Sequence, residues 1–190
     1  MRYVSLCVGI LLWLLALTSL IGAFELSADM VTRDGTQRQV GKLYVKGNKY
    51  RIEMKNASEY AIIRHDKNKS WIVIPERKAY IEMPFDPKKR PAIEESRQSE
   101  GNRTYLGSEV IEGQMAKKYR VTTNGAEQDE SFYQWIAMDT DFPVKTMAAD
   151  GSWSVEYSNI RGTVSDGLFE LPEAYEKLTM PPADVGEFAK

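Results

Sequence analysis

Alternation of apolar and polar residues with a period of two is the feature that most constrains the fold of this 190-residue chain. It begins near Phe24 and recurs in short runs, as where Tyr50, Ile52 and Met54 alternate with charged residues. Successive side chains of a strand point to opposite faces, so this period is typical of half-buried antiparallel strands. The fold class is therefore predicted to be mainly β.

Turn residues separate these runs and predict how the strands connect. Gly47-Asn48 lies between the segments 43–46 and 50–54, and Asp150-Gly151 lies between 144–148 and 153–160. Both pairs tolerate positive φ, so two tight hairpins are expected. Further strands are predicted at 24–30, 80–83, 107–111, 115–121 and 131–138, with about five strands before residue 84 and a short edge segment at 168–172.

Two neighbouring segments differ from the rest because they are apolar on both strand faces. They are 61–63 and 71–74, and polar residues 66–69 form a turn between them. Such strands are expected to be covered on both sides. Trp71 is accordingly predicted to be buried in the sheet core.

Residues 84–103 interrupt the strand pattern with three prolines and nine charged residues. Ala92 and Ile93 are the apolar residues in its middle. This composition predicts a surface flap or loop with at most a short helix, positioned over the opening of the sheet.

The first 23 residues form an apolar leader. A short basic start at Arg2, an apolar run over 4–20 and small residues before Phe24 are typical of a secretory signal peptide that is removed after Ala23. Export to the periplasm follows from this interpretation. The alternative is that residues 4–23 remain as an inner-membrane anchor.

The residue inventory offers little support for catalysis. Cys7 lies in the leader and His65 is the single histidine, next to an expected turn, so no metal site, cofactor or catalytic residue is predicted and the protein is not expected to be an enzyme. The net charge of −2 disfavours nucleic acid as a partner.

Aromatic residues and methionines instead favour the binding of an apolar ligand, because methionine adapts to variable shapes. The alternative is that these residues only pack against one another. The candidate cavity residues are Leu43, Val45, Tyr50, Ile52, Met54, Trp71, Val73, Tyr80, Trp135 and Trp153.

Four stretches, taken in order, resemble the periplasmic lipoprotein-carrier superfamily, the LolA/LolB-like proteins and especially the outer-membrane lipoprotein-sorting relatives with a shortened N-terminus. They are the hairpin Gly41–Met54, the strand pair from Ile62 to Tyr80, the later hairpin Phe142–Ile160 and the closing segment Leu168–Pro172. This resemblance implies an incomplete antiparallel β-barrel, a half-barrel, whose apolar interior holds lipoprotein acyl chains.

Two functions remain open at this point. The first is a periplasmic, non-enzymatic carrier or binding protein for lipoprotein acyl chains or another hydrophobic ligand. The second is an envelope protein-interaction or sensory module in which the barrel is filled and a protein partner is recognised. In both cases the expected organisation is a leader at 1–23, a monomeric half-barrel domain at 24–180 and a C-terminal tail at 181–190.

Overall fold

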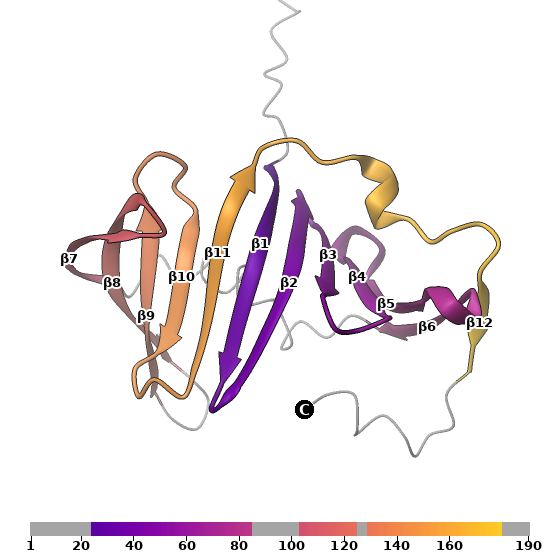
Figure 1. The fold of residues 1–190 in the computed structure, drawn as a ribbon, viewed down its shortest axis with the longest axis horizontal. Coiled ribbons are helices and arrows are strands. Elements are labelled where there is room, and N and C mark those ends of the chain that lie inside the picture. Colours follow the sequence, from indigo (N-terminus) through magenta and orange to yellow (C-terminus); the bar gives the residue numbers. More distant parts are fainter. Residues whose placement is uncertain (1–23, 85–102, 125–128, 180–190) are drawn as a thin grey trace, which may run out of the picture.

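The structure, a computed structural model, describes residues 24–84, 103–124 and 129–179. Within these ranges, strands dominate and form a single sheet (Figure 1). The strands are β1 (Glu25–Asp34), β2 (Gln37–Lys46), β3 (Lys49–Met54), β4 (Tyr60–Arg64), β5 (Lys69–Ile74), β6 (Ala79–Pro84), β7 (Arg103–Ile111), β8 (Gln114–Asn124), β9 (Asp129–Ala137), β10 (Pro143–Ala148), β11 (Trp153–Arg161) and β12 (Glu176–Leu178). Three 3₁₀ turns accompany them: η1 (His65–Lys67), η2 (Pro75–Arg77) and η4 (Asp166–Phe169).

The sheet consists of two meanders joined in the middle. Its strand order is β12-β6-β5-β4-β3-β2-β1-β11-β10-β9-β8-β7. All neighbours are antiparallel except β12, which runs parallel to β6. The first strand, β1, therefore pairs with β2 on one side and with the late strand β11 on the other.

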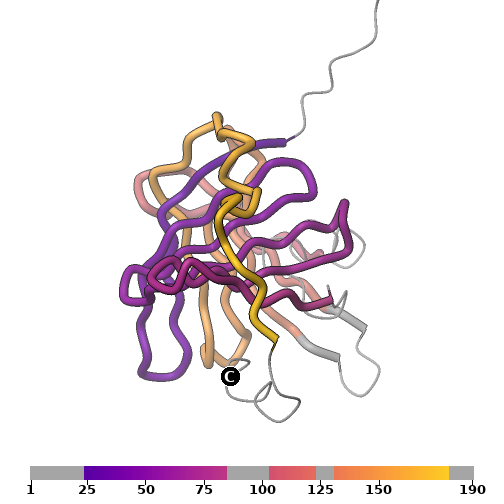
Figure 2. The backbone as a smooth tube through the Cα atoms, turned by 90° about the vertical axis from the view of Figure 1, so that its right-hand side faces the viewer, coloured from indigo at the N-terminus to yellow at the C-terminus, as the bar shows by residue number. Residues whose placement is uncertain are grey.

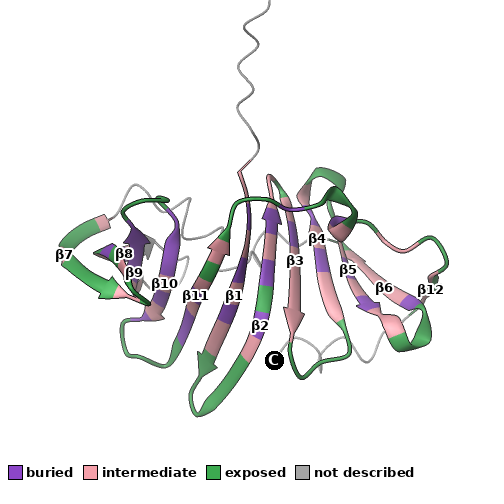
Figure 3. Ribbon diagram, turned by 45° about the horizontal axis from the view of Figure 1, so that its top comes forward, coloured by how far each residue is buried: buried purple, intermediate pink, exposed green. Residues whose placement is uncertain are grey.

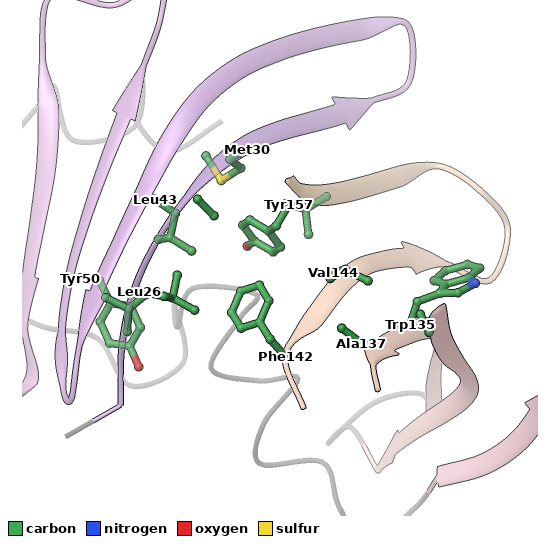
Figure 4. Close-up of a cluster of buried hydrophobic side chains, with 13 residues drawn as sticks. Leu26, Met30, Leu43, Tyr50, Trp135, Ala137, Phe142, Val144 and Tyr157 are labelled. Carbon is green, nitrogen blue, oxygen red and sulfur yellow. The ribbon is translucent and has the colours of Figure 1, made fainter. Parts of the chain in front are cut away.

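The sheet curves toward one face, which we call the inner face. Side chains of β1, β2 and β3 meet those of β10 and β11 there in one buried cluster, although β3 and β10 are four positions apart in the strand order (Figure 4). Phe142, for example, packs against Phe24 and Tyr157 with ring centroids 6.2 and 5.5 Å apart. Strands so far apart can share a cluster only because the sheet bends. The sheet does not close, so the predicted mainly-β half-barrel is confirmed.

The hairpins follow the local turn chemistry. Lys46 pairs with Lys49 across Gly47-Asn48, and Gly47 has a φ of 57°, so that hairpin is confirmed. The hairpin at Asp150-Gly151 is also present, and its loop extends over 149–152. The Asp150 carboxylate there accepts hydrogen bonds from the backbone N–H and the hydroxyl of Ser152, at 2.9 and 2.7 Å.

Six strands lie within residues 24–84, which agrees with the expected number of about five. One detail of the expected strand pattern is wrong. The edge strand expected at 168–172 is absent, because Phe169 ends the turn η4 and is fully buried against the sheet instead of pairing at its edge. The edge is formed by the more polar β12, which pairs with β6. The flap expected at 84–103 lies almost wholly outside the described residues.

Candidate functional site

The inner face of β2 to β6 carries two apolar rows that cross the strands. We call them the inner rows. Strand register places Leu43, Ile52, Ala61, Ile72 and Ile81 opposite one another in the first row, and Val45, Tyr50, Ile63, Ser70 and Met83 in the second. Residues that face each other across strands lie about 4.5 to 5.5 Å apart, so each row is a continuous apolar surface apart from Ser70.

Burial decreases along the inner rows from the middle of the sheet toward its β6 side. Leu43 and Val45 of β2 are each 1% exposed, because the central cluster covers them. Ile72 of β5 and Ile81 of β6 are only half-buried. The part of the inner rows on β5 and β6, which we call the open half, is therefore an apolar surface that the described residues leave partly exposed.

The two faces of the same strands differ sharply in charge. No residue of the inner rows is ionisable at neutral pH, whereas the other face of β3 carries Lys49, Arg51 and Glu53. Placing a charge against an apolar surface is costly because the charge loses its hydration. The inner rows therefore suit a neutral, aliphatic group.

The outer face of β3 to β6 is covered by the chain after β11. We call residues 162–178 the strap, which is yellow in Figure 2. Its Val164 and Phe169 join Ile62, Trp71 and Val73 in a second buried cluster. The indole Nε1 of Trp71 donates a hydrogen bond to the Glu82 carboxylate at 3.1 Å. Trp71 is 5% exposed, which confirms its predicted burial.

Cations on β2, β3 and β4 fix the strap. Lys46 and Lys49 donate to the Asp166 carboxylate at 2.8 and 3.1 Å. Arg51 donates to the carbonyl of Leu168 at 3.1 Å. The hydrogen bonds from Lys46, and then from Lys49, lower the pKa of Asp166.

Arg64 makes the most buried of these contacts, with 4% of its surface exposed. Its guanidinium donates to the Phe169 carbonyl at 3.1 Å and also pairs with Glu170 and Asp66. The hydrogen bonds to Asp66, and then to Glu170, raise the pKa of Arg64. Loss of either carboxylate partner would leave this buried charge uncompensated, so these contacts hold the strap in one position on β4.

The ten predicted cavity residues do not lie together. Leu43, Val45, Tyr50, Ile52 and Met54 share the inner face, whereas the register places Trp135 on the outer face opposite Lys145 and Lys118, whose ammonium groups lie over its ring. Trp71, Val73 and Tyr80 belong to the outer cluster under the strap, and Trp153 is 39% exposed. That these residues bind a ligand remains a prediction.

Six residues of the inner rows were absent from the predicted set, and four of them are large and apolar, namely Ile63, Ile72, Ile81 and Met83. Period two shows that such residues share a face within one strand, but it does not align neighbouring strands. The hairpin turns were the available signal. The polar turn at 66–69 aligns β4 with β5 and places Ile63 opposite Ser70, but the pairing of Ile63 with Tyr50 also depends on the connection 55–59 between β3 and β4.

Within the described ranges, no group of three or more His, Cys, Asp or Glu side chains is arranged to hold a metal ion. Neither does any helix of those ranges have the length and apolar character required to cross a membrane.

Solved structures share this fold at low sequence identity. MucB in complex with MucA(peri) matches with a TM-score of 0.52 and 11% identity over 83% of this chain, and MucB alone matches with 0.52 and 10% over 80%. The present chain covers 57% and 59% of those MucB chains. The Mycobacterium tuberculosis lipoprotein LppX is similar at a TM-score of 0.47, with 14% identity over 76% of this chain and 90% of LppX. The MucB likeness shows a shared fold.

Sequence comparison places the chain in a family without assigning an activity. No curated protein sequence matches it. A family model does match residues 24–141, which include β1 to β9 and the inner rows. The chain therefore belongs to the family described as "Domain of unknown function (DUF4412)".

Proposed function

We propose that this protein is a non-enzymatic envelope protein that binds an acyl chain or a similar neutral apolar ligand on the inner rows. The observation that carries this proposal is the open half of those rows, on β5 and β6. It is apolar, uncharged and only half-buried, and it lies on the inner face of a sheet that does not close. Apolar surface of this kind gains free energy when a ligand removes it from water. Met83 lets the surface adapt to ligand shape.

The resemblance to lipoprotein carriers supports the same function. It relates the half-barrel to proteins whose interior holds lipoprotein acyl chains, and LppX, a lipoprotein by name, is among the similar structures. Export through a leader that is removed after Ala23, and residence in the periplasm, belong to this proposal.

A substitution on the inner rows tests the proposed site. Ile72→Asp introduces a charge in the half-buried part of the first row, and we expect it to weaken binding of a fluorescent fatty acid at least about tenfold, since a carboxylate there must lose hydration when the ligand binds. Val31→Asp is the matched control, because Val31 is also half-buried but lies on the outer face of β1. Thermal unfolding of both variants reports whether each remains folded.

Two results would contradict the proposal. The first is a wild-type protein that neither binds the fatty acid nor carries lipid that organic extraction and native mass spectrometry can detect. The second is an equal loss of binding in the folded Ile72→Asp and Val31→Asp variants.

A protein-interaction module is the second candidate function, and one comparison favours it. MucB, which shares the fold, was crystallised with MucA(peri), and the β2 part of the inner rows here is already filled by protein side chains. Affinity purification from envelope extracts under native conditions separates the candidates. Lipid that co-purifies with the protein supports the carrier function, while a stoichiometric protein partner without lipid supports the protein-interaction module.

A further inference from the structure

The two edges of the sheet are built differently. β12 forms one edge with only three residues, two of them charged, and its Lys177 pairs with Glu82 at 2.8 Å. Short, charged edge strands prevent a sheet from pairing with another chain. β7 forms the other edge with nine residues, of which two, Arg103 and Glu109, are charged, and Glu109 is already paired with Lys118 at 3.2 Å. β7 is therefore less protected than β12 against pairing with a strand of another chain.

Exposed apolar side chains gather at the β7 edge, where Figure 3 shows the strand largely in green. We call the following residues the edge patch: Tyr105, Leu106, Val110, Met115 and Met138, which are 57, 49, 62, 51 and 56% exposed. Val110 lies opposite Met115 in the β7–β8 register, and the N–H of Met138 donates to the Met115 carbonyl at 3.0 Å. Three of the five therefore form a row from the edge strand into the sheet.

The size of the edge patch fits a protein interface. Five large side chains, each about half exposed, leave on the order of 500 Å² of apolar surface in water, which is at the upper end for an isolated patch on a monomer. A specific interface buries about 800 Å² on each partner, and the backbone of a paired edge strand supplies the remainder.

We propose that the edge patch joins two copies of this chain by antiparallel pairing of β7 with its copy across a two-fold axis. Such an axis brings a strand against itself, so the apolar row meets an identical row, while Glu109 lies on the opposite face of β7 and is paired with Lys118. The edge patch carries no charged residue that would select an acidic or a basic partner, whereas it matches itself. The β-bulge between Tyr105 and Gly107 limits the regular pairing segment to Ser108–Ile111.

The test measures the mass of the purified protein by light scattering at about 1 to 100 µM. We expect the wild-type mass to rise toward twice the monomer mass. Val110→Lys should weaken dimerisation at least about tenfold, because it places an ammonium group against its own copy. Trp153→Lys is the matched control, since Trp153 is exposed but lies on β11 away from the edge patch, and it should dimerise like wild type.

Hydrogen exchange of the same samples identifies the interface. The amides of 108–111 should exchange more slowly in wild type as concentration increases, and Val110→Lys should abolish that dependence. A wild-type protein that stays monomeric at the highest concentration overturns the proposal. So does a dimer that Val110→Lys leaves intact, or concentration-independent protection of 108–111, which would mean that another part of the same chain covers the edge.

Discussion

Gly41 shows how a single missing side chain shapes the inner face. Register places it between Met30 and Met54, and a Cβ atom at this position would lie 2.3 Å from the Glu53 carbonyl oxygen and 2.9 Å from the Met54 Sδ atom. The carbonyl belongs to the backbone of a paired strand and cannot move without disturbing the ladder. The close approach of β2 and β3 at this point therefore requires glycine.

Gly41→Ala is expected to lower the free energy of unfolding by about 1 to 3 kcal/mol, the usual cost of overpacking. Urea unfolding measures the change. Gly162→Ala is the control, because a Cβ atom there meets nothing within 4 Å, and it should change stability by less than about 0.5 kcal/mol. Equal stability of Gly41→Ala and wild type would show that β2 and β3 separate more easily than their register indicates.

Trp71 is the residue for which sequence and structure agree best, because apolar neighbours on both strand faces predicted its burial. Trp71→Ala should cost about 3 to 5 kcal/mol in urea unfolding, since it leaves a cavity beneath Phe169 and removes the donor to Glu82. Trp153→Ala, at a 39% exposed position, should cost much less. Similar losses for both tryptophans would contradict the placement of the outer cluster.

At the scale of single elements, the strap depends on ionised carboxylates. The hydrogen bond from Lys177 is the largest of the contacts that lower the pKa of Glu82 from 4.5 to about 2, with Trp71 and Lys69 contributing next. A carboxylate whose pKa is lower in the folded than in the unfolded chain stabilises the fold above the unfolded pKa. That stabilisation is lost as pH falls through the folded pKa.

The free energy of unfolding should therefore decline as pH falls from 4.5 toward 2, and the decline should be smaller in Glu82→Gln. Urea unfolding across this pH range measures it. Glu173→Gln, at an exposed position of the strap, is the control and should keep the wild-type slope. Added salt should reduce the difference between Glu82→Gln and wild type, because these groups lie at the surface. An unchanged slope in Glu82→Gln would exclude this carboxylate as the cause.

The hairpins were predictable from sequence and the strap was not, for a physical reason. A hairpin such as the one at Gly47-Asn48 is set by residues adjacent in the chain, whose allowed φ angles already fix the turn. The turn η4 is held by contacts such as that between Arg64 and the Phe169 carbonyl, which are 105 residues apart. Local patterns carry no information on such pairs. The inner rows were only partly predicted because register between strands also depends on distant contacts.

At the scale of the whole molecule, the two clusters share strands. β4 and β5 present the inner rows on one face and the strap-covered cluster on the other. Neither cluster can be lost without disturbing strands that support the other. We therefore expect one cooperative thermal transition, with coincident midpoints by tryptophan fluorescence and far-UV circular dichroism. Two separated midpoints would show that the meanders on either side of β1 unfold independently.

The central pairing of β1 with β11 also constrains when the molecule can fold. The side-chain amide of Asn159 donates to the Asp29 carboxylate at 2.7 Å across 130 residues. One edge of β1 therefore stays unpaired until β11, near the end of the chain, is available. Contacts between residues so far apart in sequence slow folding. In a chain that crosses a membrane from its N-terminus, the sheet stays incomplete until residues 153–161 have emerged. Late completion of this kind keeps a polypeptide unfolded during translocation and delays the native state until the crossing is nearly finished.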